Sequence, residues 1–130
     1  MRDLAAVFKA LSDETRLSML GLLLREGELC VCDFVAVLAV TQSKASRHLR
    51  YLVNAGLLQD RRAATWVHYR IADKPEDMQA AVLTQLRRIL PNQVPRKLLY
   101  ALKSWRKRCA SDGPACKAAS VVKRTTEGRR

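Results

Sequence analysis

Aromatic residues and long apolar runs are scarce in this sequence. Phe, Trp and Tyr make up only 5% of the 130 residues, so the core must be built mainly from aliphatic side chains. The longest apolar runs, such as residues 20–24, are far shorter than the ~20 residues that a membrane-spanning helix needs. The first residues also lack the pattern of a signal peptide. We therefore expect a cytoplasmic protein with no membrane partner.

Signatures of thiol-dependent and phosphate-binding enzymes are missing as well. No phosphate-cradling loop follows an expected strand, no Cys-x-x-Cys motif occurs, and no acid/base pair flanks the cysteines. These absences argue against a thiol-dependent oxidoreductase, which is the enzyme alternative. We expect a protein that is not an enzyme and that uses no organic cofactor.

Acidic residues are few relative to basic ones. The chain has 24 Lys and Arg against 12 Asp and Glu, and its formal charge of +12 favours nucleic acid as a partner before an anionic membrane surface. Residues 106–130 alone hold eight basic and two acidic residues. We expect one domain over residues 1–108 and a flexible basic tail over residues 109–130. This charge also permits an architectural protein that binds DNA regardless of its sequence.

Residues 42–54 form an expected helix that contains no acidic residue. Thr41 is a suitable N-cap, and Gly56 is a suitable stop. A shorter expected helix, residues 30–39, precedes it, and the pair predicts a helix-turn-helix whose second helix enters the major groove of DNA. Arg and Lys can hydrogen-bond guanine edges and Gln can hydrogen-bond adenine. The side chains expected to face DNA are Gln42, Ser43, Lys44, Ser46, Arg47 and Arg50.

Two short segments, residues 58–62 and 66–71, predict a β-hairpin after this helix. A hairpin in this position forms a wing, and Arg61 and Arg62 suit it to contact with DNA phosphates. The predicted fold class is therefore mostly α with a small β-hairpin, a winged helix-turn-helix. In the second segment we expect Val67, Tyr69 and Ile71 to point inward, and Trp66, His68 and Arg70 to point outward.

Three further expected helices, residues 3–11, 75–90 and 94–108, carry apolar stripes. Together these stripes exceed what a small winged domain can cover. We assign them to a homodimer interface formed by the N- and C-terminal helices. A symmetric dimer also matches the palindromic sites of double-stranded DNA that such proteins bind.

Cys30 and Cys32 lie one residue apart at the expected start of the helix over residues 30–39. In a reducing compartment, cysteines bind metals, act in redox chemistry or are simply buried as small apolar residues. On a regular helix, residues i and i+2 point to nearly opposite sides. We therefore expect that one ion can bind both sulfurs only if the first turn of this helix opens or distorts.

The sequence contains the segments LSDETRL (residues 11–17), ELCVCD (28–33), SKASRHL (43–49) and WVHYR (66–70). Together they closely resemble the ArsR/SmtB family of metal-responsive winged-helix repressors. The resemblance covers about residues 3–105, and segment 28–33 (ELCVCD) has the pattern of the arsenite-, antimonite- and cadmium/lead-responsive members. In that family the apo dimer binds an operator over the promoter of its own resistance operon, and metal binding releases it.

The resemblance implies a repressor whose inducer is As(III) or Sb(III), bound by cysteine thiolates. As(III) and Sb(III) commonly bind three sulfurs. The best-known arsenite sensors have a third cysteine where this chain has Val35. We expect Cys30 and Cys32 to supply two sulfurs, and Cys109 or Cys116 to supply the third. In a rival arrangement, the latter two cysteines form a site of their own.

Two other modes of induction remain open within the same family. Cd(II) or Pb(II) also favours sulfur-rich sites, and a redox switch would instead oxidise the cysteines to disulfides. A zinc sensor of the type that places its ligands on the dimer-interface helix is not expected, because residues 78–90 contain no His, Cys, Asp or Glu. His48 and His68 are expected to be structural or to face DNA.

Overall fold

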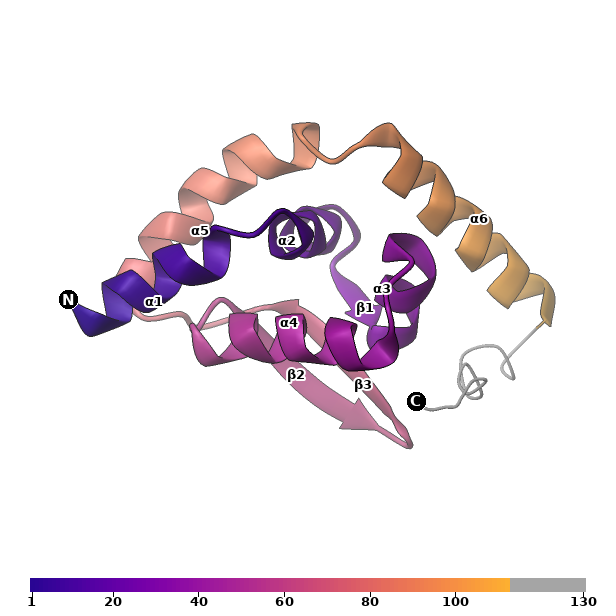
Figure 1. The fold of residues 1–130 in the computed structure, drawn as a ribbon, viewed down its shortest axis with the longest axis horizontal. Coiled ribbons are helices and arrows are strands. Elements are labelled where there is room, and N and C mark those ends of the chain that lie inside the picture. Colours follow the sequence, from indigo (N-terminus) through magenta and orange to yellow (C-terminus); the bar gives the residue numbers. More distant parts are fainter. Residues whose placement is uncertain (113–130) are drawn as a thin grey trace.

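A computed structural model describes residues 1–112, in which α-helices pack beside a small antiparallel sheet whose hairpin projects from the lower edge of the molecule (Figure 1). The helices are α1 (Arg2–Leu11), α2 (Glu14–Glu26), α3 (Val31–Leu38), α4 (Gln42–Asn54), α5 (Asp77–Ile89) and α6 (Arg96–Asp112), with a 3-10 turn, η1 (Leu90–Asn92). The strands are β1 (Glu28–Cys30), β2 (Leu58–Ala63) and β3 (Trp66–Ile71), in the order β1-β3-β2. The predicted winged helix-turn-helix class is confirmed. Among the described residues, no helix has the length and hydropathy needed to cross a membrane.

Side-chain caps fix where the central helices begin. The Asp13 carboxylate accepts a hydrogen bond from the backbone N–H of Arg16 at 2.9 Å, and this bond caps α2. Thr41 caps α4 in the same way by accepting from the backbone N–H of Lys44 at 3.1 Å. Gly27 ends α2 with a φ of 92°, a conformation that favours glycine. The bounds predicted for α4, residues 42–54, are confirmed.

Strand β1 is a feature that the sequence did not predict. Its three residues pair with β3, which places Glu28 opposite Arg70 and Cys30 opposite His68. The wing is therefore part of a three-stranded sheet rather than an isolated hairpin. The predicted alternation in β3 is also wrong at Trp66, which is buried while Val67 is only half-buried. Burying the larger apolar surface is the more favourable arrangement.

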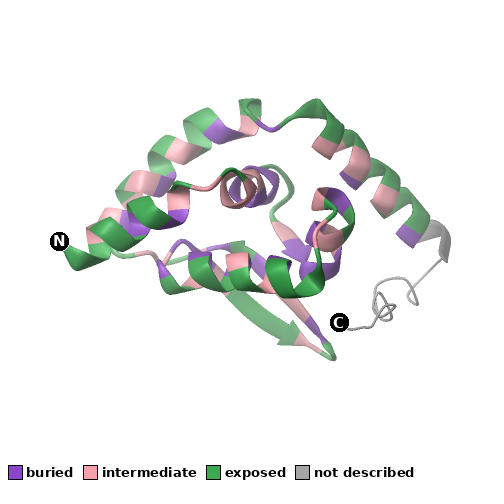
Figure 2. Cartoon of the chain, in the orientation of Figure 1, coloured by how far each residue is buried: buried purple, intermediate pink, exposed green. Residues whose placement is uncertain are grey.

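The core is mainly aliphatic, as the scarcity of aromatic residues predicted. Figure 2 shows the buried residues gathered on α2, α3 and the facing sides of the other elements. The outer helices leave large apolar side chains exposed: Phe8 is 58% exposed on α1, Ile89 52% on α5 and Tyr100 67% on α6. The fully buried large side chains include Leu20, Leu22, Leu23, Leu29, Phe34, Leu49, Leu52 and Leu57.

Helix α6 is longer than predicted. It continues to Asp112, so the predicted domain boundary between residues 108 and 109 falls inside a helix. Cys109 is only 4% exposed on this helix and does not belong to a flexible tail. Residues 113–130, including Cys116, lie outside the described part of the chain, and the flexible tail remains a prediction there.

Candidate thiol site and nucleic-acid interface

The side chains of two cysteines meet where β1 joins α3. Cys30 is the last residue of β1 and also the N-cap of α3, and Cys32 lies in the first turn of that helix. Their Sγ atoms are 2.6 Å apart, and both residues are buried, at 5% and 7% exposure. A single soft ion can therefore contact both sulfurs.

The expectation that the helix must open to bring the sulfurs together is wrong. Cys30 lies outside the helix in an extended conformation, with φ −85° and ψ 157°. This conformation turns its side chain toward that of Cys32, whose backbone N–H donates to the Cys30 Sγ at 3.3 Å. The two sulfurs thus converge while α3 keeps its regular geometry.

Asp33 connects the thiol turn to α6. One of its carboxylate oxygens accepts a hydrogen bond from the backbone N–H of Cys30 at 2.8 Å. The other oxygen accepts from the indole Nε1 of Trp105 at 2.8 Å. The Cys30 and Asp33 side chains form a reciprocal capping box at the start of α3. A displacement at the thiols therefore reaches both α3 and α6.

A pocket of about 370 Å³ lies beside the two thiols. Cys109 contributes to its wall from α6, but it is disulfide-bonded, so it offers no free thiol. Within residues 1–112, no group of three or more His, Cys, Asp or Glu side chains is arranged to hold a metal ion. The structure brings together two sulfurs, and the third ligand remains a prediction. The pocket is lined by Glu28, Cys30, Cys32, Asp33, His68, Arg106 and Cys109.

Glu28 and Arg61 form a two-point ion pair at the edge of this pocket. Arg61 donates from Nε at 2.9 Å and from Nη2 at 2.7 Å to the two carboxylate oxygens. The hydrogen bond from Arg61 is the main cause that lowers the pKa of Glu28, with smaller contributions from the charges of Arg61, His68 and Arg70. Arg61, predicted to contact DNA, is thus held by a carboxylate in the free protein.

The exposed side of α4 carries the other residues predicted to contact DNA. Gln42, Ser43, Lys44, Arg47 and Arg50 are exposed, and Ser46 is half-buried. Arg50 donates to Asp60 of β2 at 2.8 Å, which ties α4 to the wing. Arg62 is exposed on β2. These positions leave the side chains accessible, and their contact with DNA remains a prediction.

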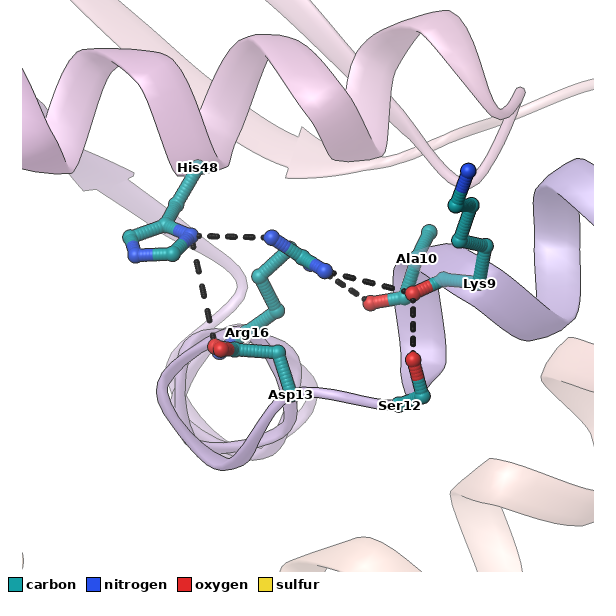
Figure 3. Close-up of polar contacts among 6 residues, drawn as sticks. All are labelled: Lys9, Ala10, Ser12, Asp13, Arg16 and His48. Carbon is teal, nitrogen blue, oxygen red and sulfur yellow. Dashed lines mark hydrogen bonds and ion pairs between the residues drawn. The ribbon is translucent and has the colours of Figure 1, made fainter.

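His48 faces the interior side of α4 rather than its exposed face. Its Nδ1 lies 3.1 Å from Arg16 Nη1 and 4.0 Å from the Asp13 carboxylate (Figure 3). Arg16 also donates from Nε to the backbone carbonyl of Ala10 at 2.7 Å and lies over the Tyr51 ring at 4.2 Å. This arrangement joins α1, α2 and α4.

Arg16 was not singled out from the sequence. A signal for it exists, because a cation in the first turn of a helix is opposed by the positive end of the helix dipole. A basic residue at that position therefore indicates that its contacts with other elements outweigh the unfavourable interaction with the helix dipole.

Comparisons with known proteins place this chain in one family. A family model described as "Bacterial regulatory protein, arsR family" matches residues 13–60, from the cap of α2 into β2. The chain is 54% identical over 65 residues to the arsenic resistance transcriptional regulator ArsR1 of Pseudomonas putida, a match covering 50% of this chain and 51% of that protein. It thus spans about half the length of this relative.

Three further relatives extend the comparison. The arsenical resistance operon repressor of Bacillus subtilis is 39% identical, over 57% of this chain and 70% of that protein. A cadmium resistance regulatory protein CadC homolog of Staphylococcus aureus is 44% identical, over 55% of this chain and 60% of that protein. The structure of HlyU from Vibrio cholerae superposes with a TM-score of 0.56 at 31% identity, over 68% of this chain and 91% of that one. The chain therefore belongs to the ArsR family of bacterial regulatory proteins.

Proposed function

We propose that this chain is a transcriptional repressor of a metal(loid) resistance operon, released from operator DNA when As(III) or Sb(III) binds its cysteine thiolates. The observation that carries the proposal is the 2.6 Å approach of the Cys30 and Cys32 sulfurs in a pocket beside the helix-turn-helix. Trivalent arsenic and antimony are soft and prefer thiolates. The arsenic-resistance functions in the names of two relatives support this inducer class.

Release is proposed to begin at the N-cap of α3. The Cys30 sulfur accepts a hydrogen bond from the backbone N–H of Cys32. An ion bound to this sulfur competes for the same electron pair and so weakens the hydrogen bond. Losing this cap shifts the start of α3, which packs against α4. A coupling of about 1–3 kcal/mol between the thiol site and DNA binding is enough for an effective switch.

The third sulfur is proposed to come from Cys109 or from Cys116. Cys109 lines the same pocket and can act as a ligand once its disulfide is reduced. Cys116 follows α6 by a few residues, in the part of the chain that the structure does not describe. A ligand from either position would join α6 to the thiol turn.

The DNA-binding form is proposed to be a homodimer. The exposed apolar side chains of Phe8, Ile89 and Tyr100 lie on α1, α5 and α6, which are the helices predicted to pair. Covering them with a second copy removes apolar surface from water. Two copies of α4 can then meet two half-sites of double-stranded operator DNA, with Arg61 and Arg62 of the wing beside them.

Metal titration of the protein bound to DNA from upstream of its own gene tests the proposal. Under reducing conditions, arsenite or antimonite should release the DNA at lower concentrations than Cd(II) or Pb(II). Release by Cd(II) at the lower concentration contradicts the As/Sb assignment. It would favour the cadmium/lead alternative, which the similarity to the CadC homolog supports.

A redox-switch repressor is the second candidate, and the disulfide of Cys109 favours it. In that case peroxide should release the DNA, and arsenite should have no effect on the reduced protein. Release of the reduced protein by arsenite contradicts this candidate.

A further inference from the structure

We propose that Glu28 and Arg61 link the thiol site to the wing, so that inducer binding changes how the wing meets DNA as well as the position of α4. The inference rests on the proposed function and adds a second route of release. It assigns Glu28 the role of a positioning residue, which acts through the wing arginine and does not itself bind the inducer or DNA.

The register of the sheet puts the Cys30 thiol and the wing arginine in one row. Cys30 of β1 lies opposite His68 of β3, and His68 in turn lies opposite Arg61 of β2. Glu28 precedes Cys30 by two residues, and residues two apart in a strand point to the same face. One side chain of the short strand β1 therefore carries a thiol while another reaches toward the wing.

The Glu28–Arg61 pair spans β3 and joins the two outer strands of the sheet. Both nitrogens of Arg61 that contact Glu28 are within 2.9 Å of its carboxylate oxygens. A paired arrangement of this kind uses the same edge of the guanidinium that binds a phosphate group. This edge of Arg61 can therefore bind either the Glu28 carboxylate or a DNA phosphate. While it is bound to Glu28, the position of the Arg61 side chain depends on the position of β1.

β1 is short enough to move as a unit with the thiols. It contains only three residues, and Cys30 and Glu28 are its two ends, about 7 Å apart along the strand. Both residues line the thiol pocket. An inducer that draws the Cys30 sulfur into its coordination shell therefore displaces the backbone that carries Glu28. Because Arg61 is bound to Glu28 at two points, the displacement reaches β2.

A second ion pair offers a matched control. Arg50 of α4 and Asp60 of β2 are 2.8 Å apart, and this pair also involves the wing. It makes no connection to β1, because α4 is its other element. Asp60→Asn therefore removes a comparable ion pair from the wing while the link to the thiol strand stays intact.

The test is the ratio of operator Kd values measured with saturating arsenite and without it. Saturation is judged from the thiolate–arsenic absorbance of each variant. We expect the ratio to fall about two- to fivefold in Glu28→Gln, a size that suits a partly exposed ion pair. Arg61→Gln removes the same pair from the other side and should lower the ratio similarly, whereas Asp60→Asn should keep the wild-type ratio.

A second readout comes from the metal-free protein. Glu28→Gln releases Arg61 from its carboxylate partner, so operator binding should strengthen at low salt. The dependence of log K on log [salt] should steepen by about 0.9 for each additional phosphate that the variant neutralises. Arg61→Gln should show no such change.

The outcomes separate this inference from the function it rests on. Wild-type ratios in both Glu28→Gln and Arg61→Gln, with normal release of the wild-type protein, overturn the link alone. A wild-type protein that binds its operator and is released by none of the proposed inducers overturns the proposed function and the link together. The link is also overturned if Asp60→Asn lowers the ratio of Kd values as much as Glu28→Gln does. In that case, loss of any ion pair of the wing would have the same effect.

Discussion

The Cys30 sulfur accepts a hydrogen bond from the backbone N–H of Cys32 and at the same time faces the second thiol. Serine is one of the preferred N-cap residues, so its hydroxyl can replace the sulfur as a cap but not as a soft ligand. This difference separates the structural role of Cys30 from its proposed role as an inducer ligand.

Cys30→Ser and Cys32→Ser are expected to abolish release by arsenite while operator binding and the thermal midpoint stay close to wild type. The measurement is arsenite-induced release from operator DNA, with a thermal melt of each variant as the control. Cys109→Ser and Cys116→Ser, tested in parallel, identify the third ligand. Loss of response in these two variants, with full response in the first two, would overturn the assignment of the thiol site.

Glu28 gives the stability a defined pH dependence. Its pKa is lowered from the ordinary value of 4.5, mainly by the hydrogen bond from Arg61, so the folded state favours the carboxylate. The resulting stabilisation is present above pH 4.5 and is lost as the pH falls through the lowered pKa of the folded state. We expect urea unfolding to give a small stability difference between wild type and Glu28→Gln at pH 7 that is smaller at pH 3. An equal difference at both pH values would contradict this expectation.

At the level of elements, α2 lies directly against the segment around η1. A Cβ added at Gly21 would lie 2.5 Å from Cγ2 of Val94, which is too close for the two atoms to coexist without movement. Glycine at this position allows α2 to approach the turn between α5 and α6.

Gly21→Ala is therefore expected to destabilise the protein by about 1–3 kcal/mol through overpacking. Val94→Ala removes the clashing methyl groups, so the double variant should be more stable than the sum of the two single changes predicts. Urea unfolding of the four proteins measures this interaction. Additive effects would indicate that the helix and the turn separate freely.

Local signals in the sequence were sufficient for most helices. Thr41 caps α4 through its own side chain, so the start of this helix could be predicted. The three residues of β1 are too few to show a periodicity, and their partner in β3 is far along the chain. That strand therefore could not be predicted from the sequence.

The candidate site was predicted in its residues but not in its geometry. The spacing of Cys30 and Cys32 identified the thiols, but their convergence depends on the extended backbone that β1 imposes on Cys30. Arg61 was recognised as basic, but its pairing with Glu28 arises from the register of three strands. The burial of Cys109 likewise depends on how α6 packs against α3.

At the scale of the whole molecule, the charge of +12 is expected to make DNA binding strongly dependent on salt. Arg62→Ala should weaken binding to operator and to unrelated DNA alike and reduce the salt slope by about 0.9 for each phosphate that is no longer neutralised. Gln42→Ala should instead reduce the preference for operator over unrelated DNA. Fluorescence anisotropy at several salt concentrations distinguishes the two effects. Equal losses of specificity in both variants would contradict these roles.

The cap at the start of α3 has a consequence for observing the protein in solution. The amide proton of Cys32 points at the sulfur that is proposed to receive the inducer. Its NMR chemical shift and its rate of exchange with deuterium therefore respond to the first event at the site, before any change at the DNA surface. This single proton would let binding of the inducer be timed separately from release of the operator.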